Sequence, residues 1–300
     1  MQKISLAALL LIIFSALCVA RPSLAGSDSE VPFSFEKGYV VVQAKFKGNV
    51  PVDVILSTGS EHSVFNTGLL EKYKLPSYYA GVPPVTGRDD RIYSFTMVTD
   101  VSVGDAKAGS LNMRLGSLSE LGQLLGREIF CVLGMDFFRG RVVQFDFKNQ
   151  VVRFLPKSPA DALKSKPSAG ETIALPMAEG GSALNNYLTM PAVEKITFNG
   201  KEAKVLLDTG RATVVALSAS AAKKLGYTPP PEKSGPRVDK IDSLRLGLYE
   251  IKDVPVALYA KGANASQGFG DYGAIIGSGF LQNFIVTFDF RSKVVILQHL

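Results

Sequence analysis

The sequence predicts an all-β protein made of two copies of one lobe, and three observations lead to this prediction. An apolar segment that ends in a Thr-Gly turn occurs twice, at residues 49–60 and again at 199–210. Each copy is followed further along the chain by an apolar segment ending in glycine, and then by a pair of β-rich segments. Helical periodicity is confined to two short stretches, so strands must supply most of the core.

The opening part of each copy leads from the Thr-Gly turn into a short predicted helix. Residues 49–60 precede a predicted helix at 67–73, and residues 199–210 precede one at 218–225. A repeat of more than a hundred residues is too long for a solenoid unit, so it indicates a duplicated lobe.

The closing part of each copy predicts a β-hairpin. β-Branched and aromatic residues dominate these segments, and turn residues separate them, which is the pattern of paired strands. In the first copy, Cys-Val-Leu-Gly at 131–134 precedes strands at 142–147 and 151–154; in the second, Ala-Ile-Ile-Gly at 274–277 precedes strands at 285–290 and 294–297. Further strands are expected at 91–103 and 111–115, and at 241–246 and 254–258.

These patterns divide the chain into a leader and two lobes joined by a linker. The segment after the first hairpin contains Pro156, Pro159 and Pro167 among lysine, serine and alanine, which is a linker composition. We expect a signal peptide at 1–25, lobe 1 at 26–155, the linker at 156–175 and lobe 2 at 176–300.

The leader predicts export to the periplasm or secretion. Lys3 precedes an apolar run, and Ser-Leu-Ala at 23–25 supplies the small residues that a signal peptidase needs, so cleavage is expected after Ala25. A retained membrane anchor is the alternative, but the run is shorter than the ~20 residues that span a bilayer, so we expect no stable membrane span after cleavage. Lipoprotein processing at Cys18 is disfavoured because the preceding Leu17 is bulky.

Charge and residue content argue against nucleic-acid binding, an intrachain disulfide and a metal cofactor. Removal of the leader takes away Lys3 and Arg21, which lowers the formal net charge from +6 to +4. The remaining excess is scattered without a basic run, so nucleic acid is not an expected partner. Cys131 is the single cysteine left, so no intrachain disulfide can form. With only two histidines, His62 and His299, no metal or other cofactor is expected.

The chemistry-bearing motif is Asp-Thr-Gly at 208–210, which ends the apolar run of the second copy. The strand presents a carboxylate at its end, the glycine permits a sharp turn, and the threonine hydroxyl is able to bond backbone groups across a symmetric partner loop. The sequence resembles the aspartic peptidases, specifically bacterial proteins built from two fused retropepsin-like lobes. The resemblance covers roughly residues 35–155 and 180–298.

This resemblance implies a bilobal acid-protease fold of two barrel-like lobes with short helices. In that family each lobe supplies one aspartate, and the two carboxyls share one proton because like charges so close cannot both ionise. The ionised carboxylate activates water, and the protonated carboxyl donates to the scissile carbonyl. A hairpin flap closes over a polypeptide that binds in extended form.

Position by position, lobe 1 departs from this pattern at the aspartate, which is Ser57. A serine hydroxyl does not ionise near neutral pH, so Ser57 cannot exchange the shared proton. General acid–base transfer typically contributes ~10²–10⁴ in rate, and much of that should be lost. In lobe 2, Arg211 replaces the usual serine or alanine; it either favours the ionised form of Asp208 or points to solvent. The resemblance makes Asp208 and Ser57 the catalytic positions and Thr58, Gly59, Ser60, Thr209, Gly210 and Arg211 the supporting ones.

Three functions follow from this pattern. The first is a monomeric envelope protein that binds extended polypeptide between its lobes, with an impaired intrachain site. The second is an active aspartic endopeptidase that uses Asp208 alone or pairs two copies of it in a homodimer. We expect the monomer, since lobe 1 already offers lobe 2 a matching surface at high effective concentration. The third is a structural or interaction module in which the cleft has no role.

Other chemistries receive weaker support from the sequence. A triad of Ser57, His62 and Asp208 would need a nucleophile elbow, and the glycine spacing around Ser57 lacks one. Asp-Asp at 89–90 is expected at a solvated hairpin tip, or on a flap that meets substrate. The glycine-rich stretch 268–273 precedes a strand rather than a helix, so a phosphate loop is not predicted.

Overall fold

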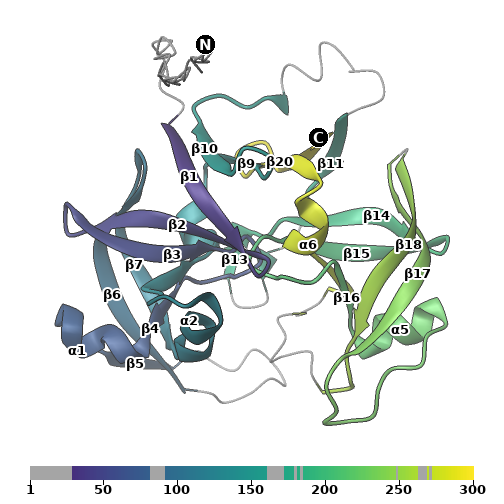
Figure 1. The fold of residues 1–300 in the computed structure, drawn as a ribbon, viewed down its shortest axis with the longest axis horizontal. Helices are drawn as coiled ribbons and strands as arrows, with labels where there is room; N and C mark the ends of the chain where they lie inside the picture. The colour runs from purple at the N-terminus through teal and green to yellow at the C-terminus, as the bar shows by residue number, and fades with distance from the viewer. Residues whose placement is uncertain are drawn as a thin grey trace, which may run out of the picture.

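The computed structural model describes residues 29–81, 92–160, 172–178, 181–182, 185–247, 249–262, 269 and 272–300. The leader, the Asp-Asp pair at 89–90 and much of the stretch 268–273 lie outside these ranges. Two β-rich lobes stand side by side, and strands from both lobes form a sheet across one end of the molecule (Figure 1). The architecture is all-β, as the sequence predicts.

Lobe 1 is a closed barrel of six strands. The order is β2-β3-β8-β4-β7-β6, and β6 closes the ring by pairing with β2. Two of the pairings, β3 with β8 and β4 with β7, are parallel. The strands are β2 (Tyr39–Phe46), β3 (Val50–Leu56), β4 (Val64–Asn66), β6 (Ile92–Val103), β7 (Ala106–Gly116) and β8 (Cys131–Leu133), with β5 (Tyr78–Gly81) added beside β6.

Lobe 2 repeats this barrel strand for strand. Its order is β14-β15-β19-β16-β18-β17, β17 pairs with β14, and the parallel pairings recur between β15 and β19 and between β16 and β18. The strands are β14 (Ala192–Phe198), β15 (Lys201–Asp208), β16 (Val215–Leu217), β17 (Arg237–Leu246), β18 (Tyr249–Leu258) and β19 (Ala274–Gly277). A separate small hairpin consists of β12 (Gly181–Ser182) and β13 (Asn185–Thr189). The duplication expected from the sequence is therefore present in the backbone.

Both predicted helices form, and the described ranges contain three further short helices of known extent. The first predicted helix comprises the 3₁₀ turn η1 (Thr67–Leu69) and α1 (Leu70–Tyr73); the second is α5 (Ala219–Leu225), capped by the Ser218 side chain, which accepts from the Ala221 amide. The unpredicted helices are α2 (Ser119–Leu125), α3 (Met135–Phe138) and α6 (Ser278–Leu281). α3 and α6 have four residues each, too few for a helical period to be visible in the sequence.

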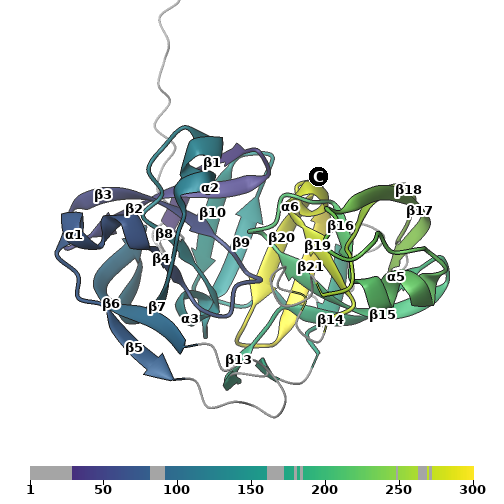
Figure 2. The same cartoon turned by 90° about the horizontal axis from the view of Figure 1, so that it is seen from below.

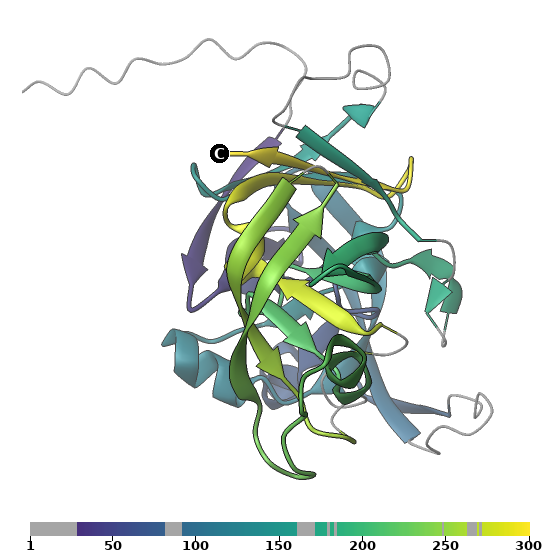
Figure 3. The same cartoon turned by 90° about the vertical axis from the view of Figure 1, so that its right-hand side faces the viewer.

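A six-stranded sheet joins the lobes in the order β11-β21-β20-β9-β10-β1. The junction is the antiparallel pair of β9 and β20, where Gln144 lies opposite Thr287 and donates to its hydroxyl over 3.1 Å. The strands are β1 (Ser29–Glu36), β9 (Val142–Asp146), β10 (Val151–Leu155), β11 (Thr172–Pro176), β20 (Phe284–Asp289) and β21 (Val294–His299). β11 thus occupies the end of the range assigned to the linker. Figure 2 shows β9 and β20 side by side between the lobes, and Figure 3 shows the molecule from the side of lobe 2.

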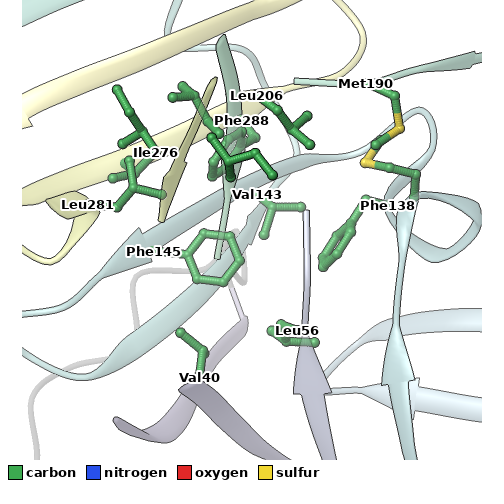
Figure 4. Close-up of a cluster of buried hydrophobic side chains, with 14 of the residues drawn as sticks. Val40, Leu56, Phe138, Val143, Phe145, Met190, Leu206, Ile276, Leu281 and Phe288 are labelled. Atoms are coloured by element: carbon green, nitrogen blue, oxygen red, sulfur yellow. The ribbon is translucent and has the colours of Figure 1, made fainter. Parts of the chain in front are cut away.

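One hydrophobic core runs through both lobes and the joining sheet. Val40 and Leu56 of lobe 1, Leu206 of lobe 2, and Phe145 and Phe288 of the sheet belong to the same buried cluster (Figure 4). The rings of Phe145 and Phe288 meet edge to face across the lobe junction with their centroids 5.9 Å apart. Within the described ranges, no helix is both long enough and apolar enough to cross a membrane.

The joining sheet should contribute strongly to stability. Val143 of β9 is fully buried opposite Phe288, whereas Val238 of β17 is 76% exposed. We expect Val143→Ala to lower the free energy of unfolding by about 2–3 kcal/mol, because two buried carbon groups are lost and a cavity remains. Val238→Ala, the same chemical change at the surface, should cost below about 1 kcal/mol. Urea denaturation measures both, and equal losses would contradict this account of the core.

Candidate active site

Two loops, one from each lobe, meet between the barrels. The lobe 1 loop leaves β3 after Leu56, and the lobe 2 loop begins at Asp208, the last residue of β15. Each loop is packed against a glycine that ends the neighbouring parallel segment. A Cβ atom on Gly277 would lie 2.3 Å from the carbonyl oxygens of Arg211 and Thr213, and one on Gly134 would lie 2.6 Å from that of Ser60. Both glycines are therefore required by close backbone approach.

The threonines of the two loops bond each other's backbone reciprocally. Thr58 Oγ1 donates to the Leu207 carbonyl over 2.9 Å and accepts from the Thr209 amide over 3.1 Å. Thr209 Oγ1 donates to the Leu56 carbonyl over 2.9 Å and accepts from the Thr58 amide over 3.2 Å. Both threonines are fully buried. Each hydroxyl thus uses its donor and an acceptor site, and four hydrogen bonds fix the lobes to each other at this point.

Ser57 and Asp208, the two predicted catalytic positions, are in direct contact. Ser57 Oγ donates to Asp208 Oδ1 over 3.0 Å. The same oxygen also accepts from the backbone amides of Gly59 over 3.0 Å and Gly210 over 2.7 Å. A Cβ on Gly59 would lie 2.3 Å from Asp208 Cγ, and one on Gly210 would lie 2.3 Å from Ser57 Oγ. The two loops therefore face each other symmetrically, with a glycine of each making room for the side chain of the other.

The chemical content of this contact is one carboxyl group and one alcohol. In a pair of carboxyls, either partner is able to hold the shared proton, so the proton can move during the reaction. Ser57 supplies a hydrogen bond in the same direction, but an alcohol retains its proton at any ordinary pH. Asp208 is half-buried and Ser57 is 6% exposed, so the pair lies at the bottom of the lobe interface.

Arg211 does not simply point to solvent, which was one of the two alternatives left open by the sequence. Its side chain is half-buried, and Nη1 donates to the hydroxyl of Tyr259 over 3.3 Å. Its guanidinium carbon lies 5.7 Å from the ring centres of both Tyr259 and Phe269, and the two rings pack edge to face. This geometry is that of a cation held against two aromatic faces.

Tyr39 of lobe 1 belongs to the same neighbourhood. It follows Gly38, whose carbonyl accepts from the Ser278 hydroxyl and whose Cβ, if present, would lie 2.5 Å from Ala212 Cβ. Burial raises the pKa of the Tyr39 phenol; the nearby Arg211 guanidinium opposes this shift, and Asp208 adds to it. Tyr39 therefore stays a neutral phenol near the lobe boundary.

Sequence reasoning missed Tyr39, Tyr259 and Phe269. Tyr259 and Phe269 follow Arg211 by several dozen residues, and only the closure of the lobe 2 barrel brings them back to it. Tyr39 comes from the other lobe, through a hairpin turn that packs on lobe 2. No local pattern in the sequence marks any of the three.

The other predicted residues have local structural contacts. Ser60 Oγ donates to the His62 carbonyl over 2.7 Å, and the Ser60 carbonyl accepts from the Met135 amide. Ser57 bonds Asp208 directly, without an imidazole between them, so the geometry does not assemble the triad with His62. Among the residues that the structure describes, no group of three His, Cys, Asp or Glu side chains could hold a metal ion.

The comparisons agree with this geometry. Residues 194–271 match the family model described as aspartyl protease, a stretch that includes the 208–210 motif and Arg211. No curated protein matches the chain. Two six-stranded barrels around facing Thr-Gly loops form a bilobal, retropepsin-like fold. The fold is thus bilobal and retropepsin-like, and residues 194–271 of its second lobe match an aspartyl protease domain.

The reciprocal hydrogen bonds of the threonines should contribute more to the free energy of unfolding than a nearby buried threonine hydroxyl does. Thr209→Val keeps the shape of the side chain but leaves the Leu56 carbonyl and the Thr58 amide buried without that partner, so we expect a loss of about 2–4 kcal/mol of unfolding free energy. Thr213→Val is the matched control, because the buried Thr213 Oγ1 has no hydrogen-bond partner among the residues that the structure describes. The control should be neutral or stabilising in urea denaturation. Similar losses in both variants would refute the role given to Thr209.

Proposed function

We propose that this protein binds extended polypeptide between its lobes and that its intrachain site is impaired in peptide hydrolysis. The observation that carries the proposal is the Ser57–Asp208 contact, where an alcohol occupies the place of one of the two carboxyls. The fold, the loops and the aspartyl protease domain are those of a polypeptide-binding enzyme. The leader supports action in the periplasm or outside the cell, and the contacts between the two loops of one chain support a monomer.

The scaffold of the site supports continued binding. The four threonine hydrogen bonds set the distance and orientation of the lobes, and neither threonine depends on the carboxyl that is missing. Recognition of an extended chain depends mainly on backbone hydrogen bonds and side-chain pockets rather than on the catalytic protons. Loss of the carboxyl at position 57 therefore leaves the requirements for binding in place.

The same contact explains why hydrolysis should be weak. Asp208 could still act as a base toward water, but Ser57 cannot donate a proton to the substrate carbonyl and recover it later. Ser57 could offer that oxygen a hydrogen bond only. We therefore expect a rate lower by ~10²–10⁴ than that of a site with two carboxyls.

An active endopeptidase that relies on Asp208 alone is the second candidate. It is favoured by the partial exposure of Asp208, together with the three donors that orient its carboxylate. A homodimer that pairs two copies of Asp208 would first have to break the bonds between Thr58 and the lobe 2 loop. The monomeric form of this candidate is thus the simpler one.

Hydrolysis by the native protein decides between these two candidates. Incubation with an unfolded protein from pH 3 to pH 7 should give cleavage no faster than an Asp208→Asn variant gives. Both proteins are purified by the same procedure, so a contaminating protease would act equally in both preparations. Cleavage by the native chain that disappears in Asp208→Asn would establish an active enzyme and refute the impaired site.

Replacement of Ser57 by aspartate should restore activity. Gly210 leaves room for the side chain at position 57 as Gly59 does for Asp208, so the longer side chain has space to form the second half of a dyad. Two adjacent carboxyls share a proton because their repulsion raises the pKa of one of them. Activity should therefore appear in acid and be lost as pH rises through that raised pKa. We expect Ser57→Asp to exceed the native rate by at least ~10²-fold, and Ser57→Asn, of similar size, to show no gain.

A further inference from the structure

We propose that Arg211, held against Tyr259 and Phe269, is a carboxylate-recognition residue of the cleft. On this proposal, the protein prefers polypeptides that carry a carboxylate close to the point where the chain passes Asp208. The carboxylate is either an Asp or Glu side chain or the C-terminal group of a peptide. The inference rests on the proposed function, because it names the class of polypeptide that the cleft accepts.

The backbone of Arg211 is fixed within the site loop. Its amide donates to the Asp208 carbonyl over 3.4 Å, and its carbonyl accepts from both the amide and the hydroxyl of Ser278, over 2.8 and 2.9 Å. The guanidinium therefore projects from a rigid part of the loop, three residues after the carboxylate. A side chain placed in this way is able to contact a ligand that also contacts Asp208.

The guanidinium itself is preorganised by its aromatic neighbours. Tyr259 is 9% exposed and Phe269 is fully buried, so the two rings form a rigid support. The guanidinium carbon lies 5.7 Å from both ring centres, and the five N–H donors of a guanidinium lie in its plane, a geometry that suits a planar carboxylate. A ligand carboxylate can join the acceptors that Arg211 already has, Tyr259 among them. Because the side chain is already ordered, binding loses little rotamer entropy.

The location of the guanidinium is the boundary between the lobes. The charges of Arg211 and Asp208, both in lobe 2, act on the pKa of the Tyr39 phenol of lobe 1: Arg211 lowers it and Asp208 raises it. The turn before Tyr39 packs directly on Ala212, the residue after Arg211. Asp208 itself repels a ligand carboxylate placed directly over it. The preferred carboxylate is therefore offset from Asp208 toward Arg211.

Peptide binding tests this inference. The probes are ten-residue peptides, acetylated and amidated, with a central Leu-Phe pair and Ser, Thr and Ala elsewhere. Each peptide carries a single Glu or a single Gln, and the position of that residue differs from one peptide to the next. A second set without Glu compares a free C-terminus with an amidated one, so the two sources of carboxylate are distinguished. Dissociation constants are measured by fluorescence anisotropy for the native chain and for Arg211→Gln, Arg211→Lys and Arg245→Gln. Arg245→Gln removes an exposed positive charge of the same lobe and controls for net charge.

We expect a carboxylate at one or two positions to tighten binding about tenfold, the usual size of a charge-assisted hydrogen-bond pair. Arg211→Gln should abolish the difference between Glu and Gln peptides, Arg211→Lys should reduce it, and Arg245→Gln should keep it. The preference should also fade below pH ~4, where the peptide Glu protonates. This last measurement needs only the native chain, so it remains decisive if a variant does not fold.

The outcomes separate this inference from the proposed function. Peptides that bind equally well with Glu and Gln, or a preference that persists in folded Arg211→Gln, would overturn the role of Arg211 while leaving peptide binding in place. Failure of the native chain to bind any peptide would overturn the proposed function, and this inference with it.

Discussion

The reciprocal hydrogen bonds of Thr58 and Thr209 are the constraint on which the site depends. Each strand that enters the site ends in a loop whose orphan backbone groups are satisfied by the threonine of the other lobe. Buried backbone groups are costly without partners, so neither lobe can complete its own loop alone. The joining sheet and the shared core support these bonds, because they hold the two threonines at the distance that the bonds require.

This constraint explains how the site tolerates the loss of a carboxyl. The bonds that fix the loops come from threonine side chains and backbone groups, and the Ser57 side chain contributes the hydrogen bond to Asp208. Its hydroxyl makes the one hydrogen bond that a protonated carboxyl would make in this direction, and the group is small enough to avoid Gly210. The structure of the loops and the proton chemistry of the site are therefore separable here: the loop contacts are present, whereas Ser57 offers no second carboxyl.

The repeat made the fold predictable, because the same order of apolar strand, Thr-Gly turn and closing hairpin is visible in the sequence of each half. The resemblance to two-lobed aspartic peptidases further implied that Ser57 and Asp208 would meet, and the structure brings them into contact. The short helices α3 and α6 could not be predicted in this way, because four residues are too few to show a helical period. The aromatic partners of Arg211 were equally hidden, because their proximity is created by barrel closure rather than by spacing along the chain.

Of the two departures from the family pattern, only Arg211 changes the charge of the site. A pair of carboxyls with one proton carries one negative charge, and so does Asp208 beside Ser57, but Arg211 adds a positive charge close to it. The added cation offsets the charge of an ionised Asp208, which weakens the repulsion that a carboxylate would meet at this site. The cation lies on one side of Asp208 only, since its aromatic support belongs to lobe 2. The backbone of the two loops is symmetric, whereas the charges around them are not, and on the proposed function this asymmetry would give a bound polypeptide a preferred direction.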